Sequence, residues 1–258
     1  APQSLKVFND TFRQTDPRHT AVHALRSLLW LQDKVAAANP ENWKPALTTL
    51  TPAKPPVAFD FVELKAEDTS EVEVLLSQLG FTMRGRHRTK PVSLWSAGDA
   101  RVVLNEQQAR DQQPHVAAVG LQGPDTAGTS ARAAELMAPV AYRRTYASEQ
   151  PFGAAVAPDG TELYWIAECP GAPAWVGEFE GGLDDSNAGG IDAIDHVNLT
   201  QPWQTAEDAV LFLTSVFGLT PDAPAEVPGP TGLVRSQVMR TADGSIRLPL
   251  NVAPHVLD

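Results

Sequence analysis

The sequence predicts an α+β fold built from three copies of a strand–helix–three-strand unit. The motif D-x-V-x-L occurs at residues 60–64 and again at 195–199, and each copy is followed by apolar residues at helical spacing. A Gly/Asp turn, typical of antiparallel strand pairs, stands before the last expected strand of each unit, at 98–99, 159–160 and 243–244. We therefore expect β-α-β-β-β repeats.

Composition narrows the class of protein. The chain has 258 residues, 43% of them hydrophobic and 20% charged, which is typical of a globular protein with a sizeable core. A net charge of −11 argues against nucleic acid or an anionic membrane as partner. The single cysteine, Cys169, excludes an internal disulfide framework and a multi-cysteine zinc site. With no secretory signal and no apolar run long enough for a membrane span, we expect a cytoplasmic protein.

The first 37 residues predict one strand and one helix. Residues 4–8 form a short β-like run, and Asp16 followed by Pro17 is typical of a helix start. A lone strand and helix cannot bury their own apolar faces, so we expect residues 1–37 to belong to a larger body that this chain lacks. The proline-rich segment 38–56 predicts a linker.

Two units are expected to pair into a first domain over residues 57–168. Paired side by side, they would form a curved sheet around a cavity, with the helices outside. The expected elements are a strand at 60–64 and a helix at 71–79 in unit one, and in unit two a strand at 115–121, a helix at 130–137, strands from Val140 and a last strand at 163–166.

The remainder predicts a second linker and half of a second domain. Residues 169–190 are rich in glycine, proline and acidic residues, and residues 191–258 hold the third unit, with its helix at 205–217. We expect its apolar surface to be covered by a second copy, by polypeptide outside this chain or by the 1–37 helix. A homo-oligomer is expected.

Several catalytic motifs are absent from the sequence. It contains no H-E-x-x-H, G-x-x-x-x-G-K-[ST], G-x-S-x-G or G-x-G-x-x-G. Nucleophile-elbow hydrolysis, nucleotide phosphoryl transfer and dinucleotide redox chemistry therefore have no support in the sequence.

The third unit resembles a known family. D-H-V at 195–197, Gly232-Leu233 leading to Ser236, and L-P-L-N at 248–251 are similar to the start of the catalytic domain of 4-hydroxyphenylpyruvate dioxygenase, which has the vicinal oxygen chelate fold. The resemblance implies that His196 is a metal ligand and that Ser236 and Asn251 face the substrate. It also implies that the remaining ligands, a His and a Glu, come from a fourth unit that this chain lacks.

The N-terminal segment extends the resemblance. Residues 4–13 and 20–30 are similar to the last strand and helix of a sugar-phosphate-isomerase-like TIM barrel. A barrel fused to a hydroxyphenylpyruvate-dioxygenase-like module is the layout of the long bacterial 3-dehydroshikimate dehydratases. The resemblance implies a lyase that forms protocatechuate in quinate and shikimate breakdown, with Mg, Mn or Co in the barrel and no catalytic residue in this chain. Lys6 departs from the family, which has a metal-ligating Glu near that position.

Two other functions stay open. One is an Fe(II) dioxygenase acting on a 2-oxo acid, with His196 as one ligand; the other is a non-catalytic dimerisation or scaffold module. A small hydroaromatic or 2-oxo acid is the expected substrate of the intact enzyme, and we predict that the 258-residue chain alone is inactive. The structural alternatives are a buried His196 bonded to backbone, and Ser236 and Asn251 as ordinary sheet polar groups.

A second, weaker metal site is conceivable in the first domain. His115 opens a strand, and Glu106 and Glu162 lie at or near strand ends, which are positions typical of ligands in this fold. Phe61 stands at the position equivalent to His196 and cannot ligate, so we favour a relic.

One strand of the first domain carries a run of basic residues. Alternation puts Arg84, Arg86 and Arg88 of this run on one face, which favours a solvated strand over an anion site. Cys169, in the expected linker, has no evident His partner and is interpreted as an ordinary thiol.

Overall fold

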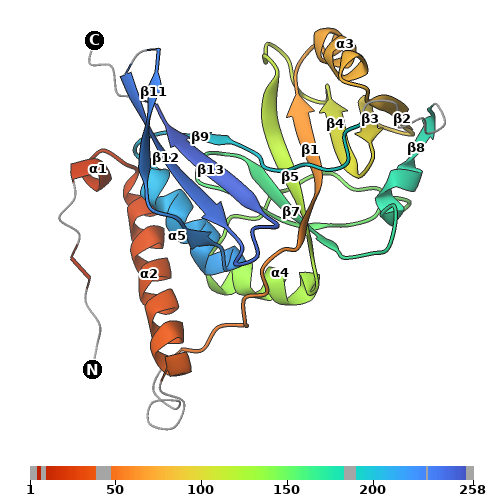
Figure 1. Ribbon diagram of the computed structural model, residues 1–258. Coiled ribbons are helices and arrows are strands. Elements are labelled where there is room, and N and C mark those ends of the chain that lie inside the picture. The colour runs from red at the N-terminus through yellow and green to blue at the C-terminus, as the bar shows by residue number, and fades with distance from the viewer. Residues whose placement is uncertain (1–4, 7–9, 39–47, 183–189, 231, 254–258) are drawn as a thin grey trace.

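The computed structural model has two mixed β-sheets that share one layer of helices (Figure 1). It describes residues 5–6, 10–38, 48–182, 190–230 and 232–253. The expected α+β class is confirmed. No helix in these ranges is long and apolar enough to cross a membrane.

Three units follow one another along the chain. The first contains β1 (Ala58–Lys65), α3 (Ser70–Gln78), β2 (Thr82–His87), β3 (Val92–Ala97) and β4 (Ala100–Asn105). The second contains β5 (His115–Gly123), α4 (Thr126–Glu135), β6 (Gly153–Val156) and β7 (Glu162–Ala167), and is followed by the 3-10 helix η1 (Ala174–Glu178) and β8 (Phe179–Gly181). The third contains β9 (Leu199–Gln201), α5 (Ala206–Phe217), β10 (Thr220–Pro221), β11 (Ala225–Gly229), β12 (Gly232–Arg240) and β13 (Arg247–Val252).

Strand pairing confirms the repeat. In each unit the first strand pairs in parallel with the last, as β1 with β4, β5 with β7 and β9 with β13, and the last pairs antiparallel with the strand before it. An antiparallel pairing of β1 with β5 joins the first two units into an eight-stranded sheet. The third unit forms a separate five-stranded sheet.

The register identifies equivalent positions in the first and third units. Leu64 pairs with Leu104 in the first sheet, and Leu199 pairs with Leu250 in the second. The residue after each of these last-strand leucines is an asparagine, so Asn105 and Asn251 occupy corresponding positions. The same alignment sets Phe61 against His196, and Glu63 against Asn198.

One apolar core holds the second and third units together. Leu163 on β7, Phe212 on α5 and Leu248 on β13 are fully buried in the same cluster, and the rings of Trp165 and Phe217 lie 6.0 Å apart. Helices therefore cover one face of the eight-stranded sheet, while its other face packs around Phe61, Tyr164 and Trp175. This is the expected arrangement of a sheet with helices outside.

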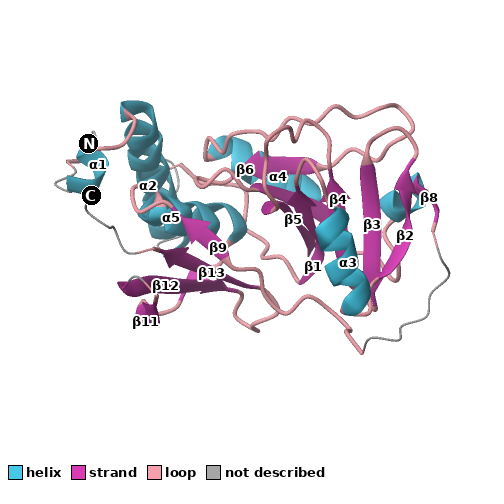
Figure 2. Cartoon of the chain, turned by 90° about the horizontal axis from the view of Figure 1, so that it is seen from above, coloured by secondary structure: helices cyan, strands magenta, loops and turns pink. Residues whose placement is uncertain are grey.

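The N-terminal helix packs on the helical layer and not on an open sheet face. After the short helix α1 (Asp10–Arg13), α2 (Pro17–Ala38) begins at the predicted Asp16–Pro17 signal, with the Asp16 carboxylate accepting a 2.7 Å hydrogen bond from Arg18 N. Figure 2 shows α2 beside α5. Buried Arg26 donates to Asp208 of α5 at 3.0 Å and to the Leu136 carbonyl at 3.0 Å.

The expected 169–190 linker contributes to the first sheet. Its β8 pairs with β2, and the buried Trp175 of η1 donates to the Asp60 carboxylate at 2.8 Å. Gly85 permits this pairing, because its φ is +149° and a Cβ there would lie 2.7 Å from Glu180 N. Glycine and proline content predicts irregular backbone, but it does not exclude a short edge strand.

Other boundaries differ from the prediction. Helix α4 begins at Thr126 and not at 130, because Asp125 caps it by accepting from Gly128 N at 2.8 Å. The strand expected from Val140 is reduced to a single bridge with Ala155, and the chain then runs as a loop to β6. Most of the strand expected at 4–8, and residues 39–47 of the 38–56 segment, fall outside the described residues.

Candidate functional site

The predicted substrate-facing residues share one face of the second sheet. Ser236 and Asn251 are directly paired in the β12–β13 ladder. Their neighbours Leu250 and Met239 are buried toward α5, so strand alternation puts Ser236 and Asn251 on the opposite face. Asn251 Oδ1 is buried and has no hydrogen-bond partner among the described residues.

His196 lies just before β9 on the same side. Val197 and Leu199 point into the core, and the His196 side chain is 54% exposed. Its Nδ1 lies 2.8 Å from Asp195 Oδ2, and Asp195 also contacts Arg247. These contacts hold the pKa of Asp195 below its ordinary value, chiefly through the His196 hydrogen bond. The ring is therefore oriented by a carboxylate in the way metal-binding histidines commonly are.

The described residues do not complete a metal site. No group of three His, Cys, Asp or Glu side chains suited to a metal occurs within them. Of the weaker trio, His115 bonds to the Gln113 carbonyl at 2.9 Å, Glu106 accepts from Thr69 Oγ1 at 2.7 Å beside α3, and Glu162 accepts from Arg143. A first-row metal needs several such groups around one point, and here each of the three has a separate partner.

The basic strand β2 divides between its two faces. Arg86 and Arg88 lie near Glu73 and Glu180 at 3.8 and 3.6 Å with largely exposed side chains, as expected of a solvated strand face. His87, between them, points the other way and is 7% exposed. Cys169 Sγ lies 3.9 Å from the Gly171 carbonyl oxygen.

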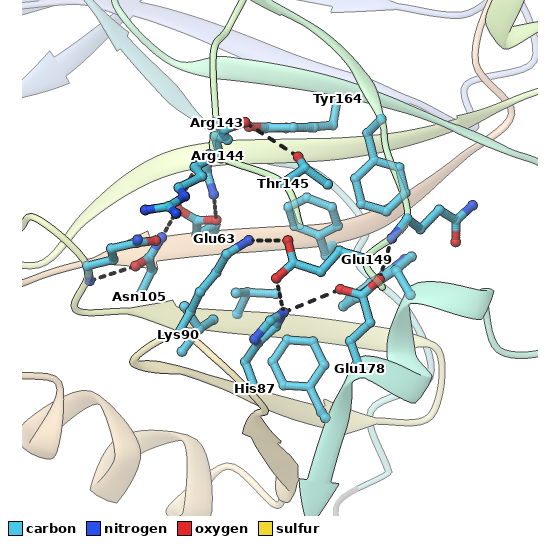
Figure 3. Close-up of a pocket in the computed structure, with 18 of the residues that line it drawn as sticks. Glu63, His87, Lys90, Asn105, Arg143, Arg144, Thr145, Glu149, Tyr164 and Glu178 are labelled. Atoms are coloured by element: carbon cyan, nitrogen blue, oxygen red, sulfur yellow. Dashed lines mark hydrogen bonds and ion pairs between the residues drawn. The ribbon is translucent and has the colours of Figure 1, made fainter. Parts of the chain in front are cut away.

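His87 leads into a cavity of about 200 Å³ in the first domain (Figure 3). The cavity lies between the strands of the eight-stranded sheet and the loop that connects α4 with β6, with η1 closing one side. Its lining combines aromatic walls with charged groups: Phe61, Glu63, His87, Lys90, Val92, Val103, Asn105, Gln107, Ala141, Tyr142, Arg143, Arg144, Thr145, Glu149, Gln150, Phe152, Tyr164, Trp175, Glu178 and Phe179.

A buried carboxylate–guanidinium pair forms one side of this cavity. Glu63, 3% exposed, accepts from Arg143 through both oxygens and from Asn105 at 3.0 Å. Arg143 Nε also donates to Glu162 at 2.6 Å, and Tyr164 donates to the same carboxylate at 2.8 Å. Burial opposes the charge on Arg143, but the Glu63 hydrogen bond and the neighbouring negative charges outweigh it and raise the Arg143 pKa. Burial, reinforced by Glu162, raises the pKa of Tyr164.

A second charged group lies across the cavity. His87 Nε2 lies 3.3 Å from Glu178 and 3.5 Å from Glu149, and Lys90 donates to Glu149 at 2.6 Å. Burial acts to raise the pKa of Glu149, but hydrogen bonds from Lys90 and from Tyr146 N overcome it and hold this pKa below 4.5. Glu149 is therefore charged at neutral pH.

Aromatic rings form a continuous wall between these groups. Phe61 lies 5.4 Å from Trp175 and 6.0 Å from Tyr164, and Tyr164 lies 6.3 Å from Phe152. Trp175 is held by Asp60, whose pKa is raised by burial although three donors oppose the shift. Such edge-on ring contacts make a rigid apolar surface.

The sequence predicted a cavity in this domain but not most of the residues that line it, because they are far apart in the chain. Arg143 and Glu149 come from a segment expected to be strand, and Trp175 and Glu178 from one expected to be linker. The available signal was the mixture of basic, acidic and aromatic residues at 142–149, which is unusual for a strand over a core.

Comparison with known proteins finds a family match and several similar proteins. Residues 55–166 match the family described as hydroxyphenylpyruvate dioxygenase, HPPD, N-terminal. A protein of Pseudomonas putida named 3-dehydroshikimate dehydratase is 31% identical over 98% of this chain and 42% of its own length. A Pseudomonas 4-hydroxyphenylpyruvate dioxygenase is 26% identical over 76% of this chain and 58% of its own length.

The structural comparison agrees. A solved structure titled xylose isomerase-like TIM barrel/4-hydroxyphenylpyruvate dioxygenase fusion protein superimposes with a TM-score of 0.80 at 27% identity, over 97% of this chain and 42% of that one. The chain thus has the vicinal oxygen chelate fold and spans about two fifths of the length of the dehydratases it matches.

Proposed function

We propose that this chain is the hydroxyphenylpyruvate-dioxygenase-like part of a two-part 3-dehydroshikimate dehydratase. It resembles that family over 98% of its length. The observation that carries this proposal is the 31% identity along the whole chain, including the N-terminal helix that precedes the oxygen chelate fold. The intact enzyme would form protocatechuate from 3-dehydroshikimate by loss of water, in the breakdown of quinate and related hydroaromatic acids.

The role proposed for the described residues is structural support of the catalytic part. Arg26 of α2 is 2% exposed and joins α5 and the end of α4 by charge-assisted hydrogen bonds, which fix this helix to the oxygen chelate module. A barrel continuous with α2 would be held in one orientation by these bonds. The proposed role of this chain in the dehydratase is therefore to support and assemble the catalytic part. We also propose that the intact enzyme is a homo-oligomer.

A divalent metal is proposed for the intact enzyme, with Mg, Mn or Co in the dehydratase. The described residues do not fit a complete metal site. The alternative function is an Fe(II) dioxygenase, in which His196, held by Asp195, would be one metal ligand. Its support is the 26% identity to a 4-hydroxyphenylpyruvate dioxygenase over 76% of this chain.

The test uses a chimera of the Pseudomonas putida relative in which this chain replaces the matching region. We expect the chimera to release protocatechuate, which is measured by its absorbance. The relative lacking that region should form a smaller oligomer or lose activity. The 258-residue chain alone should neither form protocatechuate nor consume oxygen with 4-hydroxyphenylpyruvate and Fe(II). A folded but inactive chimera, or turnover by the chain alone, contradicts the proposal.

A further inference from the structure

We propose that the cavity of the first domain is a binding site for a small aromatic carboxylate. Neither the dehydratase reaction nor the dioxygenase resemblance assigns a ligand to this cavity, and the inference does not depend on either. It follows from three features of the described residues, namely the aromatic wall, the unequal use of hydrogen-bond donors and acceptors, and a basic mouth.

The wall fits a flat ring. The Phe61 ring lies 6.0 Å from Tyr164 and 5.4 Å from Trp175 with tilted or edge-on planes, so a single planar ring can stack or meet an edge inside the cavity. At about 200 Å³ the cavity is smaller than the roughly 300–1,000 Å³ of sites for drug-sized ligands. A one-ring molecule is therefore the appropriate size.

The carboxylates that line the cavity already have hydrogen-bond donors within the protein. Three lining carboxylates, those of Glu63, Glu149 and Glu178, offer two oxygens each. Every one of these oxygens accepts at least one hydrogen bond from within the protein. The negative charge of each carboxylate is therefore already engaged by protein donors, which reduces its attraction for a ligand cation such as an amine.

The donors are only partly used. Arg143 carries five N–H groups, of which Nε, one on Nη1 and one on Nη2 are bonded to glutamates. Lys90 gives one of its three N–H groups to Glu149, and no carboxylate of the described residues pairs with Arg144. Cationic N–H groups therefore remain available at the cavity, and a ligand carboxylate is the acceptor that pairs with them best.

The free donors gather at the mouth. Tyr146 holds both cations there, because Arg144 stacks over its ring at 4.8 Å and Lys90 Nζ lies 5.8 Å from the same ring. Figure 3 shows Lys90, Arg143 and Arg144 around the space beside Glu63 and Glu149. A ligand with its ring against the inner wall would present its carboxylate to these cations.

Titration of the full chain with benzoate, followed by calorimetry, tests the site. Benzoate should bind saturably at millimolar concentration, whereas acetate, which lacks the ring, and benzamide, which lacks the charge, should bind at least tenfold more weakly, about 1.4 kcal/mol. Arg144→Gln should weaken benzoate binding at least tenfold. Arg110→Gln, an exposed arginine outside the cavity, is the matched control and should change it less than about twofold.

Ala141→Phe provides a second, charge-neutral variant, because Ala141 lines the cavity and a phenyl group there would fill it. It should abolish benzoate binding while circular dichroism shows the native fold; if it does not fold, Arg144→Gln decides the question alone. The proposal is overturned if benzoate does not saturate, if benzamide binds equally well, or if Arg144→Gln and Arg110→Gln behave alike.

Discussion

The two sheets contain the same unit, yet their polar residues differ in exposure to solvent. In the eight-stranded sheet Glu63 and Asn105 face a second unit and a covering loop, and Glu63 is 3% exposed with its charge fully paired. In the third unit, His196 and Asp195 occupy the positions of the buried Phe61 and Asp60, but their side chains are 54% and 65% exposed. The strand pattern is therefore not sufficient to make a site, because a pocket also needs a facing surface that excludes water.

The energetic consequence differs as well. The stability of the first sheet depends on the partner of each buried charge, because an unpaired buried charge costs several kcal/mol. A charge on the outer face of the second sheet is solvated and gains little from pairing. The two sheets nevertheless share one apolar core through α4 and α5, so they should differ in local energetics and not in cooperativity.

The largest expected effect tests that shared core. Phe212→Ala removes a fully buried ring of α5 and should lower the free energy of unfolding by about 3–5 kcal/mol. Because Phe212 and Leu163 belong to one cluster, denaturant curves from tryptophan fluorescence, to which Trp95, Trp165 and Trp175 of the first domain contribute, should shift together with circular dichroism. Leu233→Ala, at a 55% exposed residue, should leave both curves within about 0.5 kcal/mol. An unshifted fluorescence curve would show that the two regions unfold independently.

The next effect sharpens the contrast between buried and exposed pairs. Arg143→Met leaves Glu63 buried without its cation and should cost about 3 kcal/mol, measured by urea unfolding. Arg235→Met, which removes an exposed pair with Glu207 in the second sheet, should cost less than about 1 kcal/mol. The double variant Glu63→Gln/Arg143→Met should be less destabilised than the sum of its single variants. Equal costs for the two arginines would contradict the comparison.

The smallest effect is a pH dependence. The folded-state pKa of Glu149 lies below 4.5, so its charged form stabilises the fold above pH 4.5 and this contribution is lost as pH falls through the folded pKa. Glu149→Gln should therefore be less stable than the parent by about 1.5 kcal/mol at pH 7. The difference should shrink as the pH drops below 4.5. A gap that stays constant down to pH 3 in thermal unfolding would rule out this ionisation as its cause.

Local sequence signals predicted much of the fold. The first D-x-V-x-L strand, the three Gly/Asp turns and the Asp16–Pro17 helix start depend on backbone preferences within a few residues, and the structure has a strand, turns and a helix there. The strand expected at 195–199 is wrong for most of its length, because β9 begins only at Leu199. Where a side chain acted over a short distance outside the expected pattern, as Asp125 does at α4, the boundary moved by several residues. The shared sheet face of Ser236 and Asn251 also follows from alternation along paired strands.

By itself the sequence determined the unit, its number of copies and the resemblance that places the chain among its relatives, because periodicity and motifs are properties of neighbouring residues. Only the tertiary structure decided which polar residues lie in a pocket. Arg143, Glu149 and Trp175 come from segments with no regular pattern and meet Glu63 and His87 across long stretches of chain. Burial and charge pairing depend on that meeting, and no local preference encodes it.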